Sequence, residues 1–178
     1  MITYKDLKNK WAKKFKQADL DNADFELNEL LGVAMGVDCR SVGFVQALEN
    51  KAENEQVLEN LCNRRLNGEP LQYIIGEWEF YGLPLDISRD VLIPRADTEV
   101  LVEQALDFLK PLGQCRVLDL CAGCGQLGIE AISRGAKSAV FVDQSESACS
   151  LIRDNLKRTK FQNSAKVVHS DYLTFLQN

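Results

Sequence analysis

Histidine, proline and long apolar runs are all scarce in this sequence. It has one histidine, His169, among 178 residues, so any histidine-based triad would depend on that residue and a metal site built on several histidines is excluded. No apolar run approaches the roughly 18 residues that a membrane-spanning helix needs. The N-terminus also shows no apolar signal region behind a basic start. We therefore expect a cytoplasmic protein that neither crosses a membrane nor is secreted.

Positive charge is scarce as well. The chain carries 21 lysines and arginines against 26 aspartates and glutamates, a net charge of −5. This balance argues against broad, charge-driven binding of nucleic acid, although a local basic patch stays compatible with it. Apolar residues make up 46% of the chain and charged residues 26%, the usual balance of a globular protein with a core. The six cysteines lack the spacing of a disulfide framework, so we expect reduced thiols, as in the cytosol.

The first 68 residues have the apolar spacing of helices. One periodic segment begins behind Thr3-x-x-Asp6, a capping-box pattern, a second ends near Gly36 and a third ends at Gly68. We expect residues 1–68 to form a small helical bundle. The apolar faces carry Leu7, Trp11, Phe15 and Ala18, then Phe25, Leu30, Leu31 and Ala34, then Val57, Leu58, Leu61, Cys62 and Leu66.

The apolar period changes after residue 68. Apolar and polar residues alternate over 77–80 and again over 83–87, which is typical of two strands, and Tyr81-Gly82 lies between them as the expected turn. We expect residues 69–95 to form a β-hairpin linker.

Strands and helices alternate from residue 96 to residue 178. A helix beginning near Asp97 is followed by short apolar strands at 115–120, 139–142 and 166–169, with helical segments between them. Strands joined by helices in this rhythm require parallel pairing with right-handed crossovers. The expected fold class is therefore α/β: a helical bundle and a β-hairpin, followed by a Rossmann-like parallel sheet over 96–178.

A glycine-rich turn carries the candidate chemistry. Gly123-x-Gly125-x-x-Gly128 follows a predicted strand and opens a predicted helix, the context in which this motif binds a nucleotide. The first glycine permits a tight turn, the second lets the backbone approach a ligand, and the third lets the helix pack on the strand. Asp143 lies about 20 residues after Gly123, at the tip of the next strand, where a carboxylate accepts hydrogen bonds from both ribose hydroxyls. We expect Ala122, Gly123, Gly125 and Asp143 to contact an adenosine-containing cofactor.

An acid ahead of the glycines decides between cofactors. A dinucleotide places its pyrophosphate against the helix N-terminus and needs no acid before the glycines. Asp119 can pair with the amino group of a methionine moiety, directly or through water, so hydrogen bonding favours S-adenosylmethionine over NAD. Further along, Asp171 could accept from the adenine amino group, and Tyr172 offers a ring to lie against the base.

Two segments resemble known methyltransferases. Residues 119–125 resemble the first motif of class I S-adenosylmethionine-dependent methyltransferases. Residues 64–99 resemble the release-factor glutamine methyltransferases, most specifically in Ile-Pro-Arg-Ala-Asp-Thr-Glu at 93–99. Those enzymes join a substrate-recognition bundle and a hairpin to a class I methyltransferase domain, and they methylate N5 of the glutamine in the Gly-Gly-Gln tip of peptide chain release factors. The resemblance implies that the substrate and cofactor pocket is lined by Phe80, Arg95, Thr98 and Glu99.

The sequence departs from that family in two ways. Residues 128–156 look more like bacterial ribosomal-RNA guanine-N2 methyltransferases, which keeps an RNA substrate open as the alternative. Both families carry an Asn-Pro-Pro-Tyr or Asp-Pro-Pro-Tyr loop after a fourth strand, and this chain lacks it. Its four prolines are Pro70, Pro84, Pro94 and Pro111. We therefore identify no catalytic residue and expect a truncated methyltransferase domain without turnover. A non-catalytic remnant that binds S-adenosylmethionine or a release factor is the third candidate.

Three further patterns have simple explanations. Cys121-x-x-Cys124 could be a redox pair or half a zinc site, but no second pair has comparable spacing and the glycine turn accounts for both positions. We expect no metal. His169, in an apolar strand, is more often structural than catalytic. The basic segment 157–160 is most simply a solvated helix end, with RNA contact as the alternative.

Overall fold

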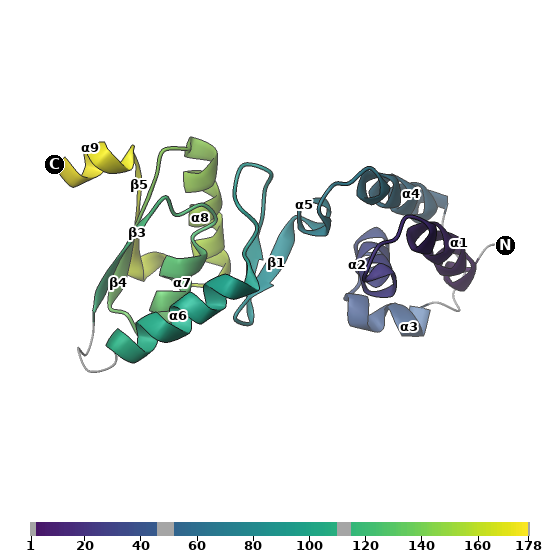
Figure 1. Ribbon diagram of the computed structural model, residues 1–178, viewed down its shortest axis with the longest axis horizontal. Helices are drawn as coiled ribbons and strands as arrows, with labels where there is room; N and C mark the ends of the chain where they lie inside the picture. Colours follow the sequence, from purple (N-terminus) through teal and green to yellow (C-terminus); the bar gives the residue numbers. More distant parts are fainter. Residues whose placement is uncertain (1–2, 46–51, 110–114, 178) are drawn as a thin grey trace. The chain divides into compact units, whose positions relative to one another are not determined.

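The chain folds into two compact units. The structure, a computed structural model, describes residues 3–45, 52–109 and 115–177 (Figure 1). The units comprise Met1–Ile75 and Gly76–Asn178, and each is described by itself. Within the described ranges, no helix has the length and apolar character needed to cross a membrane.

The first unit is a helical bundle, as its apolar spacing predicts. Thr3 caps α1, because its hydroxyl accepts from the Asp6 amide while the Asp6 carboxylate accepts from the Thr3 amide at 2.9 Å, which confirms the capping box. Gly36 ends α2 with a φ of 66°, the left-handed conformation that glycine adopts readily. The helices are α1 (Tyr4–Gln17), α2 (Ala23–Met35), α3 (Val42–Val45), α4 (Ala52–Leu66) and α5 (Leu71–Ile75), with a 3₁₀ turn at Cys39–Ser41.

The core of this unit differs from the predicted faces at three positions. Phe25 is 51% exposed, Val57 is 44% exposed and Ala18 is exposed, although all three were expected on buried stripes. In α2 the buried stripe runs from Ala23 through Leu27, and Phe25, two residues from each of them, lies on the opposite side of the helix. The fully buried side chains of the bundle include Leu7, Trp11, Phe15, Leu27, Leu30, Leu31, Leu58 and Cys62.

Residues 71–75 are helical, where the sequence was expected to lead directly into a hairpin. The carbonyl of Pro70 accepts from the amides of Tyr73 and Ile74 at 3.1 and 3.2 Å, so α5 begins at the proline. Proline is well tolerated at the start of a helix because its missing amide would have no partner there.

The hairpin opens the second unit as the alternation predicts. Strands β1 (Glu77–Phe80) and β2 (Leu83–Asp86) pair antiparallel with Phe80 opposite Leu83, so the turn has two residues. Tyr81 and Gly82 both have positive φ values, 50° and 78°. This is the turn type whose twist matches that of the flanking strands.

A long helix, α6 (Ala96–Leu109), follows the hairpin and begins within two residues of its predicted start. Its apolar spacing predicts a buried face at Leu101, Val102, Ala105, Leu106 and Leu109. That face is largely uncovered, because Val102 is buried whereas Leu101 is 58% exposed. The sequence located this helix but not the surface that it covers.

Three parallel strands form the sheet of the second unit. Strands β3 (Arg116–Leu120), β4 (Ser138–Asp143) and β5 (Ala165–His169) lie in that order, which confirms the α/β class and the parallel pairing. The helices are α7 (Gln126–Ser133), α8 (Glu146–Arg158) and α9 (Tyr172–Gln177), with a 3₁₀ turn at Gln162–Ser164. Right-handed crossovers that advance in one direction place α7 and α8 on the same face of the sheet, as Figure 1 shows.

The third glycine of the motif lets α7 approach the sheet. A Cβ at Gly128 would lie 2.3 Å from the ring of Phe141, which is fully buried in β4. The predicted role of this glycine in helix–strand packing is therefore confirmed.

Candidate cofactor site

The glycine turn lies at the carboxyl edge of the parallel sheet. The register pairs Leu120 with Val142 and Asp143 with His169, so the three strands end side by side. Residues 121–125 leave β3 at this edge, and the Ala122 amide donates to the Val142 carbonyl at 3.1 Å. Open parallel sheets bind ligands outside the carboxyl ends of their strands, so the turn occupies the expected place.

Left-handed backbone shapes the turn. Gly123 and Gly125 have φ values of 59° and 83°, and the Gly125 amide closes the turn on the Ala122 carbonyl at 2.7 Å. A Cβ at Gly125 would lie 3.3 Å from both Ile129 and Ile152. The positive φ of this residue favours glycine, and the space left for a side chain between the two isoleucines is tight.

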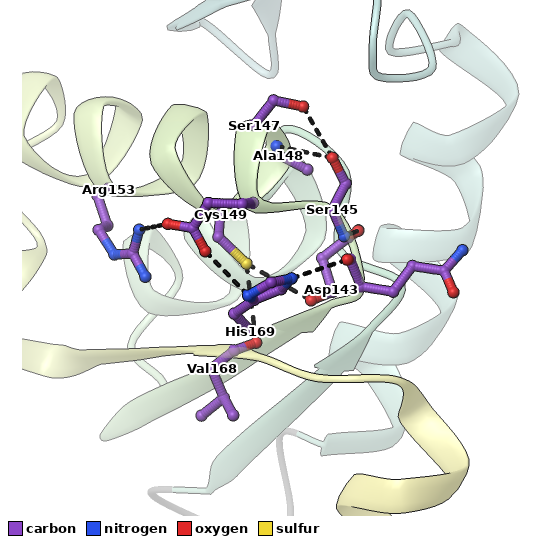
Figure 2. Close-up of polar contacts among 10 residues, drawn as sticks. Asp143, Ser145, Ser147, Ala148, Cys149, Arg153, Val168 and His169 are labelled. Atoms are coloured by element: carbon purple, nitrogen blue, oxygen red, sulfur yellow. Dashed lines mark hydrogen bonds and ion pairs between the residues drawn. The ribbon is translucent and has the colours of Figure 1, made fainter.

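Asp143 binds the turn through one carboxylate oxygen and the start of α8 through the other. Its Oδ2 accepts from the Gly123 amide at 2.9 Å. Its Oδ1 accepts from the Ser145 amide, also at 2.9 Å, and Figure 2 shows this second contact. The carboxylate thus joins the glycine turn to the first turn of α8, where the Ser145 hydroxyl accepts from the Ala148 amide. Each carboxylate oxygen has a second lone pair, so both can accept a further hydrogen bond.

Asp119 is a buried acid beside the same turn. Its side chain lies on the helix-covered face of β3, it is 8% exposed, and its Oδ2 accepts from the Gly128 amide at 2.9 Å. Burial, reinforced by the charge of Asp143, raises the pKa of Asp119 to about 6, although the hydrogen bond from Gly128 lowers it. A cation placed against this carboxylate would offset the cost of its burial.

The tip of β5 carries the remaining candidates for the adenosine end. Asp171 caps α9, because its Oδ1 accepts from the amides of Leu173 and Thr174 at 3.0 and 3.2 Å. Tyr172 follows on α9 with its ring partly exposed. The Ser170 amide donates to the Asp143 carbonyl at 3.0 Å, which fixes this tip beside β4.

His169 has structural partners at the same edge. Its Nε2 lies 2.9 Å from the Gln144 carbonyl and its Nδ1 lies 3.0 Å from a carboxylate oxygen of Glu146, which also pairs with Arg153 (Figure 2). These contacts tie the end of β5 to the start of α8.

The four pocket residues suggested by resemblance lie near the hairpin. Phe80 is buried, and its ring meets that of Tyr81 edge-on. Glu99 accepts from the Tyr81 amide at 3.2 Å through its side chain and from the Tyr81 hydroxyl at 3.0 Å through its carbonyl, so it is secured to the hairpin turn. Arg95 is exposed, and its carbonyl accepts from the Thr98 amide at 3.0 Å.

The chain segment between the hairpin and α6 passes the glycine turn. A Cβ at Gly123 would lie 4.0 Å from the Cβ of Val91, four residues before Arg95. The structure thereby brings this segment beside the turn, whereas Phe80 contributes to the core.

An ion pair near the hairpin, between the buried Glu130 and the partly exposed Arg134, was not predicted. Arg134 lies over the Tyr81 ring at 4.6 Å and its Nε binds Glu130 at 2.5 Å, while the other oxygen of Glu130 is buried with no partner among the described residues. Burial raises the pKa of Glu130 above its usual value, against the opposing effect of Arg134. The i, i+4 spacing of Glu130 and Arg134 was the available signal, but it does not reveal burial.

The two cysteines at the turn lie in different environments. Cys121 is exposed, whereas Cys124 is buried and burial raises the pKa of its thiol to about 11. A reactive cysteine needs a lowered pKa, because the thiolate is the nucleophile. All six cysteines of the chain are free.

The basic segment 157–160 is not simply a solvated helix end. Arg158 forms ion pairs with both Glu77 and Asp86 of the hairpin, and Lys157 pairs with Asp154 at 2.9 Å. The prediction was wrong for Arg158 because its partners are more than 70 residues away in the sequence.

Two protein-family models match different parts of the chain. The family model "PrmC N-terminal domain" matches residues 6–76, and "Conserved hypothetical protein 95" matches residues 95–178, which include the segment 128–156.

Three curated relatives bear the name release factor glutamine methyltransferase. The chain is 34% identical to the one from Fusobacterium nucleatum over 89% of its own length and 45% of the relative's. It is 36% identical to the relative from Buchnera aphidicola, over 86% of its own length and 56% of the relative's. It is 39% identical to the relative from Yersinia pestis, over 85% of its own length and 54% of the relative's. The chain spans about half the length of the curated relatives that it matches.

Proposed function

Because this chain belongs to the release factor glutamine methyltransferase family over the half of those proteins that it spans, we propose that it forms the cofactor-binding part of such an enzyme. The proposed reaction transfers the methyl group of S-adenosylmethionine to N5 of the Gly-Gly-Gln glutamine in a peptide chain release factor. The proposal places the protein in the cytoplasm.

One observation carries the cofactor assignment. Two carboxylates flank a left-handed glycine turn at the carboxyl edge of a parallel sheet, Asp143 bound to the turn itself and Asp119 buried behind it. This donor and acceptor set fits S-adenosylmethionine, which presents two ribose hydroxyls and a methionine ammonium. The cofactor supplies an electrophilic methyl group on its sulfonium sulfur.

The chain's own residues then have distinct tasks. Asp143 accepts from the ribose hydroxyls through its second lone pairs while it holds the Gly123 amide. Asp119 stabilises the ammonium group, which in turn stabilises the charged form of this buried acid. The backbone of Ala122, Gly123 and Gly125 lies against the methionine part, and Asp171 and Tyr172 contact the adenine.

The other parts of the chain serve the protein substrate. The bundle over 1–68 recognises the release factor, and the hairpin linker over 69–95 joins it to the cofactor domain over 96–178. Arg95, Thr98, Glu99 and Phe80 border the glutamine pocket. The sequence holds no Asn-Pro-Pro-Tyr segment of the kind that orients the glutamine amide in that family, so the proposal for this chain itself is limited to binding of the cofactor.

An RNA guanine-N2 methyltransferase is the second candidate, favoured by the sequence of 128–156. Ion pairing weakens it, because three of the arginines that could bind phosphate are already engaged. Arg64 binds Glu69 and Arg65 binds Glu26, each at 2.7 Å, and Arg158 binds the hairpin.

Calorimetry with S-adenosylhomocysteine, the demethylated cofactor, tests the site. We expect saturable binding by the chain, and we expect Asp143→Ala to weaken it by about 1–3 kcal/mol, the cost of removing an acceptor from bound hydroxyls. Asp154→Ala removes an exposed carboxylate from α8 and serves as the control, with binding unchanged. A folded sample that takes up no ligand would refute the assignment.

Binding to the two macromolecules separates the substrate classes. Immobilised chain is presented with a release factor and, separately, with small-subunit ribosomal RNA. We expect it to retain the release factor. Retention of the RNA alone would favour the second candidate.

A further inference from the structure

Asn155 is a fully buried polar side chain near the C-terminal end of α8, on the face that meets the hairpin and the glycine turn. It lies three residues after Ile152, whose side chain packs against the place where Gly125 would carry a Cβ. Burying an amide group without hydrogen-bond partners is costly, so the partners of Asn155 indicate its structural role.

The Asn155 side chain forms its hydrogen bonds with backbone atoms of two other segments. Its Oδ1 accepts from the Asp86 amide at 2.6 Å, and its Nδ2 donates to the Asp86 carbonyl at 3.1 Å and to the Cys124 carbonyl at 3.0 Å. The amide orientation is fixed, because a flipped group would turn its oxygen toward two carbonyl oxygens. One side chain therefore holds the last residue of β2 and the glycine turn together.

The neighbouring turn of α8 strengthens the hairpin side of this contact. Arg158 lies three residues after Asn155 and pairs with Glu77 and Asp86, one residue on each strand of the hairpin. Asp86 is thus bound through its backbone by Asn155 and through its side chain by Arg158. The glycine turn, by contrast, is reached by Asn155 through the single acceptor of Cys124.

We infer that Asn155 is a positioning residue that couples the hairpin to the cofactor turn. When the hairpin is docked, Asn155 holds the Cys124 carbonyl and so fixes the conformation in which Gly123 and Gly125 receive the ligand. When the hairpin is released, the amide loses two of its three partners and the turn loosens with it. The hairpin then controls the affinity of the turn for its ligand. The identity of the ligand rests on the proposed function, whereas the coupling itself does not.

Hydrogen exchange on the ligand-free chain tests the coupling. We expect Asn155→Ala to speed amide exchange at least tenfold both in 83–88 and in 121–126. Leu156→Ala is the matched control, because Leu156 is equally buried on the same helix and forms no side-chain hydrogen bond. Leu156→Ala should destabilise the whole unit without selectively speeding amide exchange in 121–126. Faster exchange in the hairpin with an unchanged turn would overturn the inference.

Affinity for S-adenosylhomocysteine gives the second readout. At a temperature where every variant is folded, we expect Asn155→Ala to raise the Kd at least tenfold and Leu156→Ala to change it less than twofold. Equal losses in the two variants would show that Asn155 only stabilises the fold. If the wild-type chain binds no ligand, the proposed function is refuted. The coupling still stands in that case if Asn155→Ala speeds amide exchange in both segments.

Asn155→Asp keeps the shape and supplies a readout that depends on pH. The carboxylate accepts from the Asp86 amide but repels the carbonyls of Asp86 and Cys124, whereas the protonated acid regains one donor. We expect its Kd, relative to wild type at the same pH, to improve as the pH falls from 8 to 5. A ratio that stays constant would contradict the role of the donated hydrogen bond, and this variant also serves if Asn155→Ala does not fold.

Discussion

Asp119→Asn should make the ligand-free chain more stable and a poorer binder of its cofactor. The side chain keeps its size, and the amide oxygen can still accept from the Gly128 amide as the carboxylate does. What changes is the charge, which the fold buries beside β3 and which burial makes costly.

The size of the effect follows from the pKa of Asp119. Burial raises this pKa from 3.8 to about 6. Between these values the folded chain binds more protons than the unfolded chain, so the free energy of unfolding falls as the pH rises from 4 to 6. A difference of about 2 pKa units corresponds to about 3 kcal/mol at neutral pH. Asparagine carries no such penalty, so the variant should gain up to about 3 kcal/mol above pH 6 and little near pH 4.

Urea unfolding followed by circular dichroism at pH 4, 6 and 8 measures this difference. Asp154→Asn, which neutralises an exposed carboxylate on α8, is the control and should differ from wild type by a constant amount across the three values. Calorimetry at pH 8 should show weaker binding of S-adenosylhomocysteine by Asp119→Asn, since the ligand ammonium loses its anionic partner. A stability difference that does not change with pH, or an Asp119→Asn chain less stable than wild type at pH 8, would refute the account of Asp119.

Two further substitutions test the packing. Gly128→Ala should lower the free energy of unfolding by about 2 kcal/mol, because the cost of overpacking against Phe141 exceeds the gain in helix propensity of about 1 kcal/mol. Gly43→Ala, in a helix where a Cβ meets open space, should be neutral or stabilising in the same urea experiment, and equal behaviour of the two would contradict the close approach of α7 to β4. Thr3→Ala removes the cap of α1 and should cost about 1 kcal/mol, visible as a lower melting temperature of the bundle, whereas an unchanged melting temperature would show that the cap is dispensable.

The sequence was sufficient wherever a structure depends on neighbouring residues. The capping box at Thr3, the left-handed end of α2 at Gly36 and the two-residue turn at Tyr81-Gly82 follow from backbone rules that act over a few positions. The parallel pairing of the strands and the place of the glycine turn at their carboxyl ends also followed, because alternating strands and helices allow few topologies.

Tertiary structure alone decided which side chains are covered and what the charged ones bind. Phe25 and Leu101 fit helical stripes but remain exposed, since periodicity gives a face without naming its partner. Arg158 resembled a solvated helix end until the fold placed Glu77 and Asp86 beside it. Asn155 gave no local signal, because its function comes from two backbone segments that lie 31 and 69 residues earlier in the chain and meet only in the folded domain.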